Sequence, residues 1–591
     1  MRSVPFLCAL SAAIVIGLSA NAKRAIPSFL HLTQPDGKDL SYIIKGDEYY
    51  HARFTSDGYR LGTDSKGFQR YLLDDGTVSS FAAHNEAERT SDETAFLQTL
   101  IKRDFSSDYA DARKQSSLRS YCSVVNNGFP TTGSPRGLVL LVSFADRAWG
   151  AQDSLQIWKD HMNAEGFHYS GATGSVRDYF VKQSSGVFTP TFDVYGPIAV
   201  SHEIAYYGKN NSSGSDENPY DMVTEACQIA HDSLGVDFSK YDSNGDGDVD
   251  YVYIFFAGYD ESNGADENCI WAHSYKLSYL HKDMQFDGKH VNGYSCSGEY
   301  YGSDTTVVQM DGVGAFCHEF SHQLGLPDLY NTNDQFKDDS WNYWSILSLG
   351  TYLNKSRTPS NYTAFERYSL GWCTPEELSE STVGVKLPEL SSSNKVYRLS
   401  SDDEDEYFLM ENRQQTGWDA YLKGHGLLIT HVDYNRYKWS ANTLNNNASH
   451  LYIEMMNADN DITWYSYGAA DVYPGTNNNT SFTDTSIPNN MLWTKKALDK
   501  NITHIAENNS VITFDMTKNT TANEPILSSD HLFVSGRLLT LRLSKVSDYT
   551  VCDISGHVIA NGFAGNAYVE LPSQGIYVVR CGTEVHKVIC K

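Results

Sequence analysis

Short apolar and aromatic runs alternate with turn-forming pairs over residues 27–76. Each pair ends in glycine, and such pairs favour the tight turns that join antiparallel strands. The pairs are Asp36-Gly37, Asp57-Gly58, Lys66-Gly67 and Asp75-Gly76. The pattern therefore predicts a small β-meander within a β-rich domain of residues 23–103.

A mixed pattern of strands and helices follows. The stretches GLVLLVSFAD (137–146) and VFTPTFDVY (187–195) predict strands, and SVRDYFVKQ (175–183) predicts a helix. The run from Tyr251 to Ala257 is β-branched and aromatic without a helical period, which indicates a buried strand. We therefore expect an α/β domain over residues 135–373.

The remaining segments are polar linkers and short strands. Residues 104–134 are polar and carry several basic side chains, so we expect an exposed, cleavable linker. Short strands and Asn/Ser/Gly loops predict an all-β domain over residues 374–517, followed by a second linker, 518–530. Residues 531–591 alternate like a small β-sandwich. The predicted fold class is α+β, with several domains.

The first 22 residues have the features of a secretory signal peptide. Arg2 precedes an apolar stretch from Val4 to Leu18, and Ala20-Asn21-Ala22 is a small-residue cleavage site. The stretch is shorter than the roughly 20 apolar residues that a membrane-spanning helix needs. We therefore predict a secreted or cell-surface protein without a transmembrane span.

The chain is strongly acidic. It has 73 Asp and Glu against 46 Lys and Arg, a formal charge of −27. Each contact with a phosphate would meet a repulsive field, which argues against nucleic acid or an anionic membrane surface as a partner. Divalent cations are more compatible partners.

The stretch GVGAFCHEFSHQLGLPDLY (312–330) carries the strongest chemical signal. His318 and His322 are four residues apart, so on a helix they share a face and both imidazoles can reach one metal ion. Glu319 lies where a carboxylate can reach a metal-bound water without ligating the metal. A glycine and a proline then turn the chain, so that Asp328 can return as a third ligand. This set suits zinc and leaves one coordination position open.

Several motifs resemble the immune inhibitor A family of secreted zinc metallopeptidases. They are FCHEFSHQLGLPDLY, WNYWSILSLG (341–350), LGW (370–372), ENRQQTGWD (411–419), GHGLLITHVD (424–433) and YPGTNNNTSFTD (473–484). The resemblance implies a metzincin-like catalytic domain, an N-terminal pro-domain that makes a latent zymogen, and a β-sandwich behind the protease. Leu347 stands where such proteins usually place the methionine of a tight turn beneath the metal.

The predicted activity is therefore zinc-dependent endopeptidase hydrolysis of protein and peptide substrates. Glu319 would act as general base, accepting a proton as water attacks the scissile carbonyl. Tyr343 and Tyr352 flank the turn, and either could donate to the oxyanion, although packing aromatics are the alternative. A zinc hydrolase of another class would use Glu366 in NYTAFERYSLGW as its third ligand. A catalytically inactive relative that acts as a surface binding or adhesion protein is the alternative function.

The stretch DSNGDGDVD (242–250) has the spacing of a calcium-binding loop. The oxygen ligands at its alternate positions are Asp242, Asn244, Asp246, Asp248 and Asp250. Position twelve, a bidentate glutamate in an EF-hand, is Tyr253 here, so a further ligand must come from elsewhere. We predict a structural calcium site, with a plain solvated turn as the alternative. Its hard oxygen ligands do not compete for zinc.

The C-terminal stretches VCDISGHVIANG (551–562) and GIYVVRCGTEVHKVICK (575–591) resemble the C-terminal sorting domain of type IX secretion cargo in Bacteroidetes. The resemblance implies that the secretion machinery is a partner of residues 531–591. An ordinary β-sandwich accessory module is the alternative.

Overall fold

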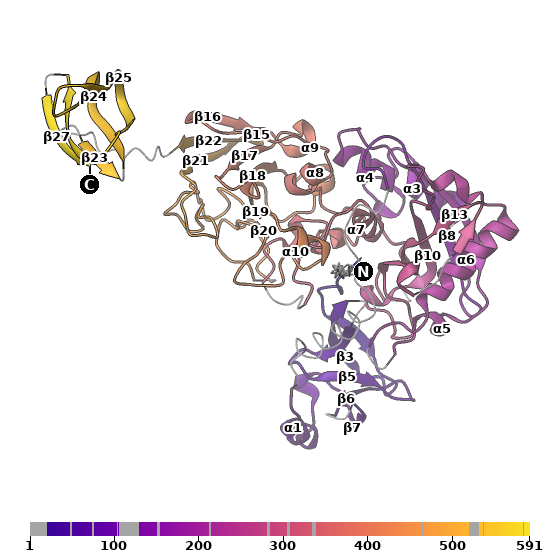
Figure 1. Cartoon of the computed structure of the whole chain (residues 1–591). Coiled ribbons are helices and arrows are strands. Elements are labelled where there is room, and N and C mark those ends of the chain that lie inside the picture. The colour runs from indigo at the N-terminus through magenta and orange to yellow at the C-terminus, as the bar shows by residue number, and fades with distance from the viewer. Residues whose placement is uncertain are drawn as a thin grey trace, which may run out of the picture. The chain divides into compact units, whose positions relative to one another are not determined.

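The computed structural model describes residues 21–47, 50–73, 76–102, 105, 129–150, 154–211, 214–280, 284–303, 308–333, 338–463, 465–518, 531–535, 537–582 and 584–590. They fall into two compact units, Met1–Thr517 and Lys518–Lys591 (Figure 1). Most of the predicted signal peptide, residues 1–20, and most of both predicted linkers lie outside the described residues, whereas Asn21 and Ala22 are described. Both units contain β-sheets and the first also contains helices, so the expectation of a mixed α+β chain is confirmed.

A six-stranded antiparallel sheet opens the first unit, and its strands pair in chain order. The strands are β2 (Leu30–Thr33), β3 (Asp39–Asp47), β4 (Tyr50–Thr55), β5 (Arg60–Thr63), β6 (Gln69–Leu72) and β7 (Val78–Ala82). Gly37, Gly58, Gly67 and Gly76 lie between strands with positive φ, a conformation that glycine adopts without strain. The predicted β-meander is therefore present, and α1 (Ser91–Leu97) packs against it.

A second six-stranded sheet, in the order β1-β11-β14-β10-β8-β9, contains the strands of the predicted α/β domain of residues 135–373. Its strands are β1 (Asn21–Ala22), β11 (His273–Lys276), β14 (Gly293–Tyr300), β10 (Val252–Tyr259), β8 (Arg136–Ser143) and β9 (Thr191–Ala199). Strands β14, β10, β8 and β9 are parallel, whereas β11 and β1 complete one edge in antiparallel pairing. The stretches predicted as strands correspond to β8, β9 and β10.

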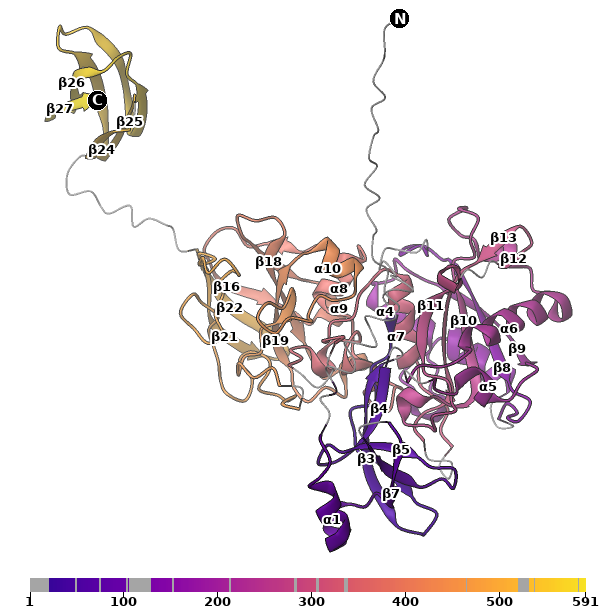
Figure 2. The same ribbon diagram turned by 60° about the horizontal axis from the view of Figure 1, so that its bottom comes forward.

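Helices cover both faces of this sheet. Along β8, Leu138 and Leu140 belong to one core, whereas Val139 and Leu141 belong to the other, because successive side chains alternate between faces. The helices of the first core are α5 (Ile204–Gly208) and α6 (Pro219–Leu234), and those of the second are α3 (Leu155–Asn163), α4 (Val176–Gln183) and α7 (Gly314–Gln323). Figures 1 and 2 show α6 and α7 on opposite sides of β10.

Residues 135–373 also contain a hairpin, β12 (Met284–Phe286) and β13 (Lys289–Val291), and a short helix, α8 (Ala364–Ser369).

Two further sheets follow α8 and share one core. The larger contains β15 (Glu376–Glu377), β17 (Tyr397–Ser400), β18 (Glu406–Arg413), β19 (Gly426–Asp433) and β20 (Ile453–Met455), and the smaller contains β16 (Thr382–Leu387), β22 (Val511–Lys518) and β21 (Lys500–Asn508). Phe408 and Ile429 of the larger sheet share a core with Ile512 of the smaller one. Leu409 and Leu428 point the other way, into the core that contains α7. Short helices α9 (Leu390–Ser393) and α10 (Arg436–Ser440) connect the strands.

The second unit is a five-stranded β-structure around its own core. Its strands are β23 (His531–Ser535), β24 (Leu538–Asp553), β25 (Val558–Glu570), β26 (Gly575–Cys581) and β27 (Glu584–Cys590). In the described part of the chain, no helix combines the length and the apolar character needed to cross a bilayer.

Candidate metal centre

Helix α7, which carries the His-Glu-His motif, begins where the backbone passes very close to another loop. A Cβ atom on Gly312 would lie 2.1 Å from the carbonyl oxygen of Ser356, and one on Gly314 would lie 2.2 Å from that of Thr351. Both contacts are far below van der Waals distance, so only glycine fits at these two positions. At its other end the helix stops at Gly325, whose φ of +99° places it in the left-handed region.

All ten residues of α7 are buried. Phe316 and Phe320 pack against Tyr251, which lies just before β10, and against Phe192 of β9. The helix is therefore anchored on the central sheet by aromatic contacts, and its opposite face carries the histidines. The buried strand predicted over residues 251–257 supports the metal centre rather than contributing to it.

The side chains of His318, His322 and Asp328 converge. Asp328 Oδ1 lies 3.4 Å from His318 Nε2 and 3.5 Å from His322 Nε2, and the two Nε2 atoms lie 3.3 Å apart. All three side chains are buried. Among the residues that the structure describes, this is the one group of three His, Cys, Asp or Glu side chains whose ligand atoms all lie within 4.8 Å of one another.

Backbone carbonyls orient the two imidazoles. His318 Nδ1 donates to the carbonyl oxygen of Ile346 (2.7 Å), and His322 Nδ1 donates to that of Leu326 (2.8 Å). A carbonyl only accepts, so Nδ1 carries a proton in each ring, and Nε2 is the nitrogen that a metal would bind. Burial also lowers the pKa of His322 to about 4, which favours the neutral form that binds metals.

A side chain from a distant segment orients Asp328. Asn442 Nδ2 donates to Asp328 Oδ2 (2.7 Å), while the Asp328 amide donates to Asn442 Oδ1 (2.8 Å). Asp328 Oδ1 is left to face the histidines. Sequence reasoning missed Asn442 because it lies in an Asn-rich loop with no motif of its own, 114 residues from its partner.

The unsatisfied atoms at this site fit a bound cation. Asp328 Oδ1 and both carboxylate oxygens of Glu319 are buried and accept no side-chain hydrogen bond from the described residues. Burial raises the pKa of Glu319 to about 8, although the charge of His318 acts to lower it. Such groups are costly to bury without a partner. Two imidazole nitrogens and one carboxylate oxygen form a donor set that suits zinc.

Glu366, the alternative third ligand, is occupied elsewhere. Its Oε2 accepts the backbone amide of Thr363 (2.6 Å) and its Oε1 accepts the hydroxyl of Ser345 (2.5 Å). With Thr363 it forms a capping box that starts α8. The structure therefore does not bring Glu366 into the group formed by His318, His322 and Asp328.

The turn at Leu347 lies beside the ligands. The carbonyl oxygen of Ile346 accepts the His318 ring proton, and that of Leu347 accepts the amide of Leu329 (3.0 Å), next to Asp328. Leu347 is fully buried and supplies apolar contacts there. The turn thus connects two of the three candidate ligands.

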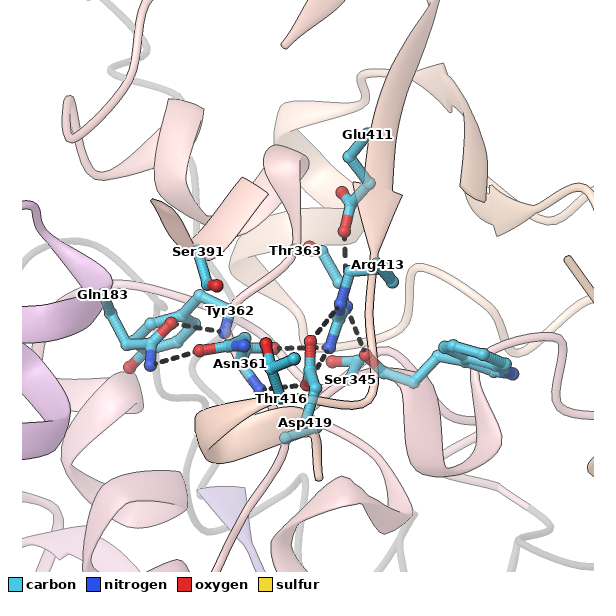
Figure 3. Close-up of polar contacts among 12 residues, drawn as sticks. Gln183, Ser345, Asn361, Tyr362, Thr363, Ser391, Glu411, Arg413, Thr416 and Asp419 are labelled. Atoms are coloured by element: carbon cyan, nitrogen blue, oxygen red, sulfur yellow. Dashed lines mark hydrogen bonds and ion pairs between the residues drawn. The ribbon is translucent and has the colours of Figure 1, made fainter. Parts of the chain in front are cut away.

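A buried ionic cluster fixes this turn to the β-domain (Figure 3). Arg413 of β18 donates to both carboxylate oxygens of Asp419 (2.7 and 2.6 Å), to the carbonyl oxygen of Trp344 (3.0 Å) and to Glu411 (3.2 Å). Asp419 also accepts the amide of Asn361 (2.9 Å). The stretch at 411–419 therefore supports the turn that contains Ile346, whose carbonyl oxygen accepts the ring proton of His318.

We expect Arg413→Ala to lower the free energy of unfolding by about 3–5 kcal/mol, because it leaves two carboxylates buried without their cation. Urea unfolding of the purified variant measures this. The matched control is Arg398→Ala, which removes a partly buried arginine from the neighbouring strand β17. Equal, small losses in both variants would contradict a supporting role for the cluster.

The two candidate tyrosines have different surroundings. Tyr352 is buried, and its hydroxyl donates to the carbonyl oxygen of Arg24. Tyr343 packs against Tyr467, with ring centroids 4.8 Å apart, and burial raises its pKa. Tyr352 thus donates to a backbone carbonyl of the N-terminal segment, whereas Tyr343 has the contacts of a packing aromatic.

The N-terminal segment of residues 21–26 lies along this centre. Asn21 and Ala22 pair with Ser274 and His273 of β11, and Trp271 Nε1 donates to the carbonyl oxygen of Lys23 (3.0 Å). The charge of Lys23 acts on Glu319, where it opposes the rise in pKa caused by burial. Sequence reasoning did not identify this segment, because no local pattern in it indicates a remote binding site.

The loop of residues 242–250, which we call the acidic loop, is held by hydrogen bonds to its own backbone. Asp242 accepts the amides of Gly245 (2.7 Å) and Asp246 (3.0 Å) and pairs with the ammonium of Lys289 (2.5 Å). Asp250 Oδ1 is buried without a hydrogen-bond partner among the described residues, and burial raises the pKa of Asp250 to about 6. Asn244, Asp246 and Asp248 are linked to each other by turn hydrogen bonds.

Comparison with known proteins gives a consistent result. Residues 134–374 match the model of the immune inhibitor A peptidase M6 catalytic domain. The chain is 29% identical over 294 residues to the pre-pro-metalloprotease PrtV of Vibrio cholerae, a match that covers 42% of this chain and 32% of that protein. It is 30% identical over 210 residues to immune inhibitor A of Bacillus thuringiensis, covering 32% of this chain and 30% of that protein.

These matches span about a third of the length of each relative. The family match includes α7 and the whole group formed by His318, His322 and Asp328. Residues 134–374 therefore resemble the catalytic domain of the immune inhibitor A family of M6 peptidases.

Proposed function

We propose that this protein is a secreted, zinc-dependent endopeptidase that is made as a latent zymogen. The observation that carries the proposal is the convergence of two imidazole Nε2 atoms and Asp328 Oδ1 beside the buried, unpartnered carboxylate of Glu319. His318, His322 and Asp328 would hold the metal. A bound zinc ion supplies a Lewis acid that polarises the scissile carbonyl and acidifies water.

The chain's own residues have separate roles in this proposal. Glu319 accepts a proton from the attacking water and delivers it to the leaving amine. Its burial raises its pKa toward neutrality, which suits a group that must both accept and release a proton near pH 7. Tyr352 donates to a peptide carbonyl, as it does to that of Arg24. Asn442 and the carbonyl oxygens of Ile346 and Leu326 are positioning groups.

Digestion of a peptide library tests the activity. Hydrolysis at internal bonds that stops with a zinc chelator and returns with added zinc supports an endopeptidase. If a zinc-loaded chain with a freed active site binds proteins without cleaving them, the alternative of an inactive binding or adhesion protein is correct.

The proposed latency rests on how residues 21–102 contact the catalytic segment. His51 Nε2 contacts Glu261 Oε2 (2.9 Å), Trp271 Nε1 donates to the carbonyl oxygen of Lys23 (3.0 Å), and Trp271 packs in the core of the meander. In this proposal, Lys23 lies beside Glu319 and obstructs access to it while the N-terminal region is attached. The Vibrio relative is named a pre-pro-metalloprotease, which is the order of processing that we propose here.

Arg24→Glu is expected to raise the peptidase activity of the unprocessed chain at least about tenfold. The new carboxylate would face Asp339 and be repelled by it, which would release the segment. Release matters because a tethered segment competes with substrate at an effective concentration on the order of millimolar. The matched control, Arg70→Glu, removes an ion pair with Asp64 inside the meander. Equal activity of wild type and Arg24→Glu in a fluorogenic peptide assay would argue against this form of latency.

We also propose a structural calcium ion at Asp242, Asn244, Asp246, Asp248 and Asp250. The buried, unpartnered oxygen of Asp250 supports it, whereas Lys289 competes for Asp242. Calcium is expected to raise the melting temperature of the wild type by binding only the folded state, and Asp242→Ala with Asp246→Ala should remove the shift without changing zinc content. Calorimetry with and without calcium checks this. An unchanged wild-type melting temperature would leave the loop a hydrogen-bonded turn.

Residues 531–591 are proposed to direct export through the secretion machinery. Their separate compact core supports an independent role. Loss of extracellular protein after their removal would support this proposal, and unchanged export would favour an accessory module.

A further inference from the structure

Resting on the peptidase function proposed above, we propose that Asp339 forms the base of a substrate site that selects an arginine side chain, and that Arg24 occupies this site in the unprocessed chain. We call it the Arg24 site and define it by Tyr330, Asp339, Ser348 and the backbone amides of Trp341 and Asn342.

Arg24 is held as a ligand would be. Its side chain is 1% exposed, and its Nη1 donates to Asp339 Oδ2 at 2.8 Å. Its Cζ lies 5.6 Å from the ring centroid of Tyr330, within the range of a cation–π contact. The pair joins segments 315 residues apart. The ion pair and the ring together recognise a flat, charged group.

The carboxylate of Asp339 is fixed by the protein itself. Its Oδ1 accepts the amides of Trp341 (3.0 Å) and Asn342 (3.1 Å), and its Oδ2 accepts the hydroxyl of Ser348 (2.6 Å). A buried carboxylate in such a network is preorganised to bind a cation without further rearrangement.

The Arg24 site adjoins the metal centre through the chain. Tyr330 lies two residues after Asp328, and Ser348 follows Leu347 in the turn that contacts His318 through Ile346. The segment that carries Arg24 also passes Glu319 at Lys23. A peptide bound in the same way would therefore present an arginine within a residue or so of the bond to be cut.

The backbone of residues 21–24 is bound by contacts that any extended peptide can make. Asn21 and Ala22 add a strand to the edge at β11, Trp271 donates to the carbonyl oxygen of Lys23, and Tyr352 donates to that of Arg24. Main-chain pairing of this kind gives affinity, whereas side-chain sites give specificity. The same contacts are therefore available to a substrate once the segment has left.

The neighbouring position is less selective. Lys23 Nζ donates to Asn263 Oδ1 (3.0 Å) and lies 4.6 Å from the ring centroid of Tyr352. Its hydrogen-bond partner is neutral and its charge acts on Glu319 and Asp311 without forming an ion pair with either, whereas Arg24 pairs directly with a buried carboxylate. A buried ion pair is a poor way to gain stability alone, since an apolar pair can do as well. Its presence at Arg24 therefore indicates selection of charge at this one position.

The test measures peptide binding without catalysis. Full-length chains carry Arg24→Glu, to release the segment, and Glu319→Ala, to prevent cleavage; Arg24→Ala replaces Arg24→Glu if the latter does not fold. The probe is a fluorescein-labelled peptide of residues 21–28, Asn-Ala-Lys-Arg-Ala-Ile-Pro-Ser, and a second version carries citrulline, an uncharged isostere, in place of arginine. Fluorescence anisotropy gives Kd for both peptides.

We expect the arginine peptide to bind at least about 30-fold more tightly than the citrulline peptide, because removing one charge of a buried pair is costly. Asp339→Asn should reduce this ratio below about threefold while Asp338→Asn, at the adjacent half-buried carboxylate, should leave it unchanged. Equal affinities for the two peptides, an unchanged ratio in Asp339→Asn, or no binding of either peptide would each overturn the proposal.

A parallel digest separates this proposal from the peptidase function. Chains with Glu319 intact and Arg24→Glu are incubated with the same peptide library. Cleavage without a preference for arginine near the cut would retain the peptidase and reject the Arg24 site. Tight, arginine-dependent binding without any hydrolysis would retain the Arg24 site and reject the peptidase.

Discussion

Glu319→Ala is expected to retain its zinc and to lose about 10²–10⁴-fold in kcat/KM for peptide hydrolysis, the usual contribution of a general base. Both carboxylate oxygens of Glu319 lie buried beside the candidate ligands and accept no side-chain hydrogen bond from the described residues, and the backbone group that acts on them is that of Lys23, in the N-terminal segment. A structural role would require such bonds. The side chain is therefore available for proton transfer, and its removal should act mainly on the transition state.

The measurement combines steady-state kinetics with the zinc content of the same preparation. Gln323→Ala is a useful control, because Gln323 is also a buried polar residue of α7 but donates to Ser274 Oγ on the sheet edge. An active Glu319→Ala enzyme with full zinc would contradict the mechanism.

Asp328→Ala is expected to lose zinc, and with it all peptidase activity, because it removes one of only three protein ligands. Glu366→Gln should keep zinc, since the Glu366 carboxylate is bound by Thr363 and Ser345 at the start of α8. Asn442→Ala tests the positioning of Asp328 and should weaken the affinity for zinc about 10–100-fold.

Zinc titration of the three purified variants measures how tightly each one binds zinc. Full occupancy in Asp328→Ala together with loss in Glu366→Gln would reverse the ligand assignment and indicate the other class of zinc hydrolase.

Local features of the fold were predictable because each depends on neighbouring residues. Gly37 and Gly67 mark turns through the positive φ that they adopt, and the meander follows from them. The spacing of His318 and His322 predicts a shared helix face, and Gly325 ends the helix as expected.

Contacts between distant segments were not predictable from these patterns. Asn442 orients Asp328 across 114 residues, and Arg24 reaches Asp339 across 315. Neither residue lies in a motif, and their meeting depends on how the β-domain and the N-terminal segment pack on the catalytic sheet. Such a contact between distant residues leaves no local period or spacing in a single sequence from which it could be predicted.

The acidic loop shows a different limit. Its spacing predicted oxygen ligands, but the hydrogen bonds of Asp242 to its own backbone and its ion pair with Lys289 depend on the hairpin β12–β13. The spacing alone therefore does not distinguish a calcium loop from a hydrogen-bonded turn.

The most direct test of the metal centre is anomalous X-ray diffraction from crystals of the zinc-loaded chain, recorded on both sides of the zinc absorption edge. The account predicts one strong peak at about 2.0–2.2 Å from His318 Nε2, His322 Nε2 and an oxygen of Asp328. A peak bound by Glu366 in place of Asp328, or a zinc peak only at the loop of residues 242–250, would contradict it.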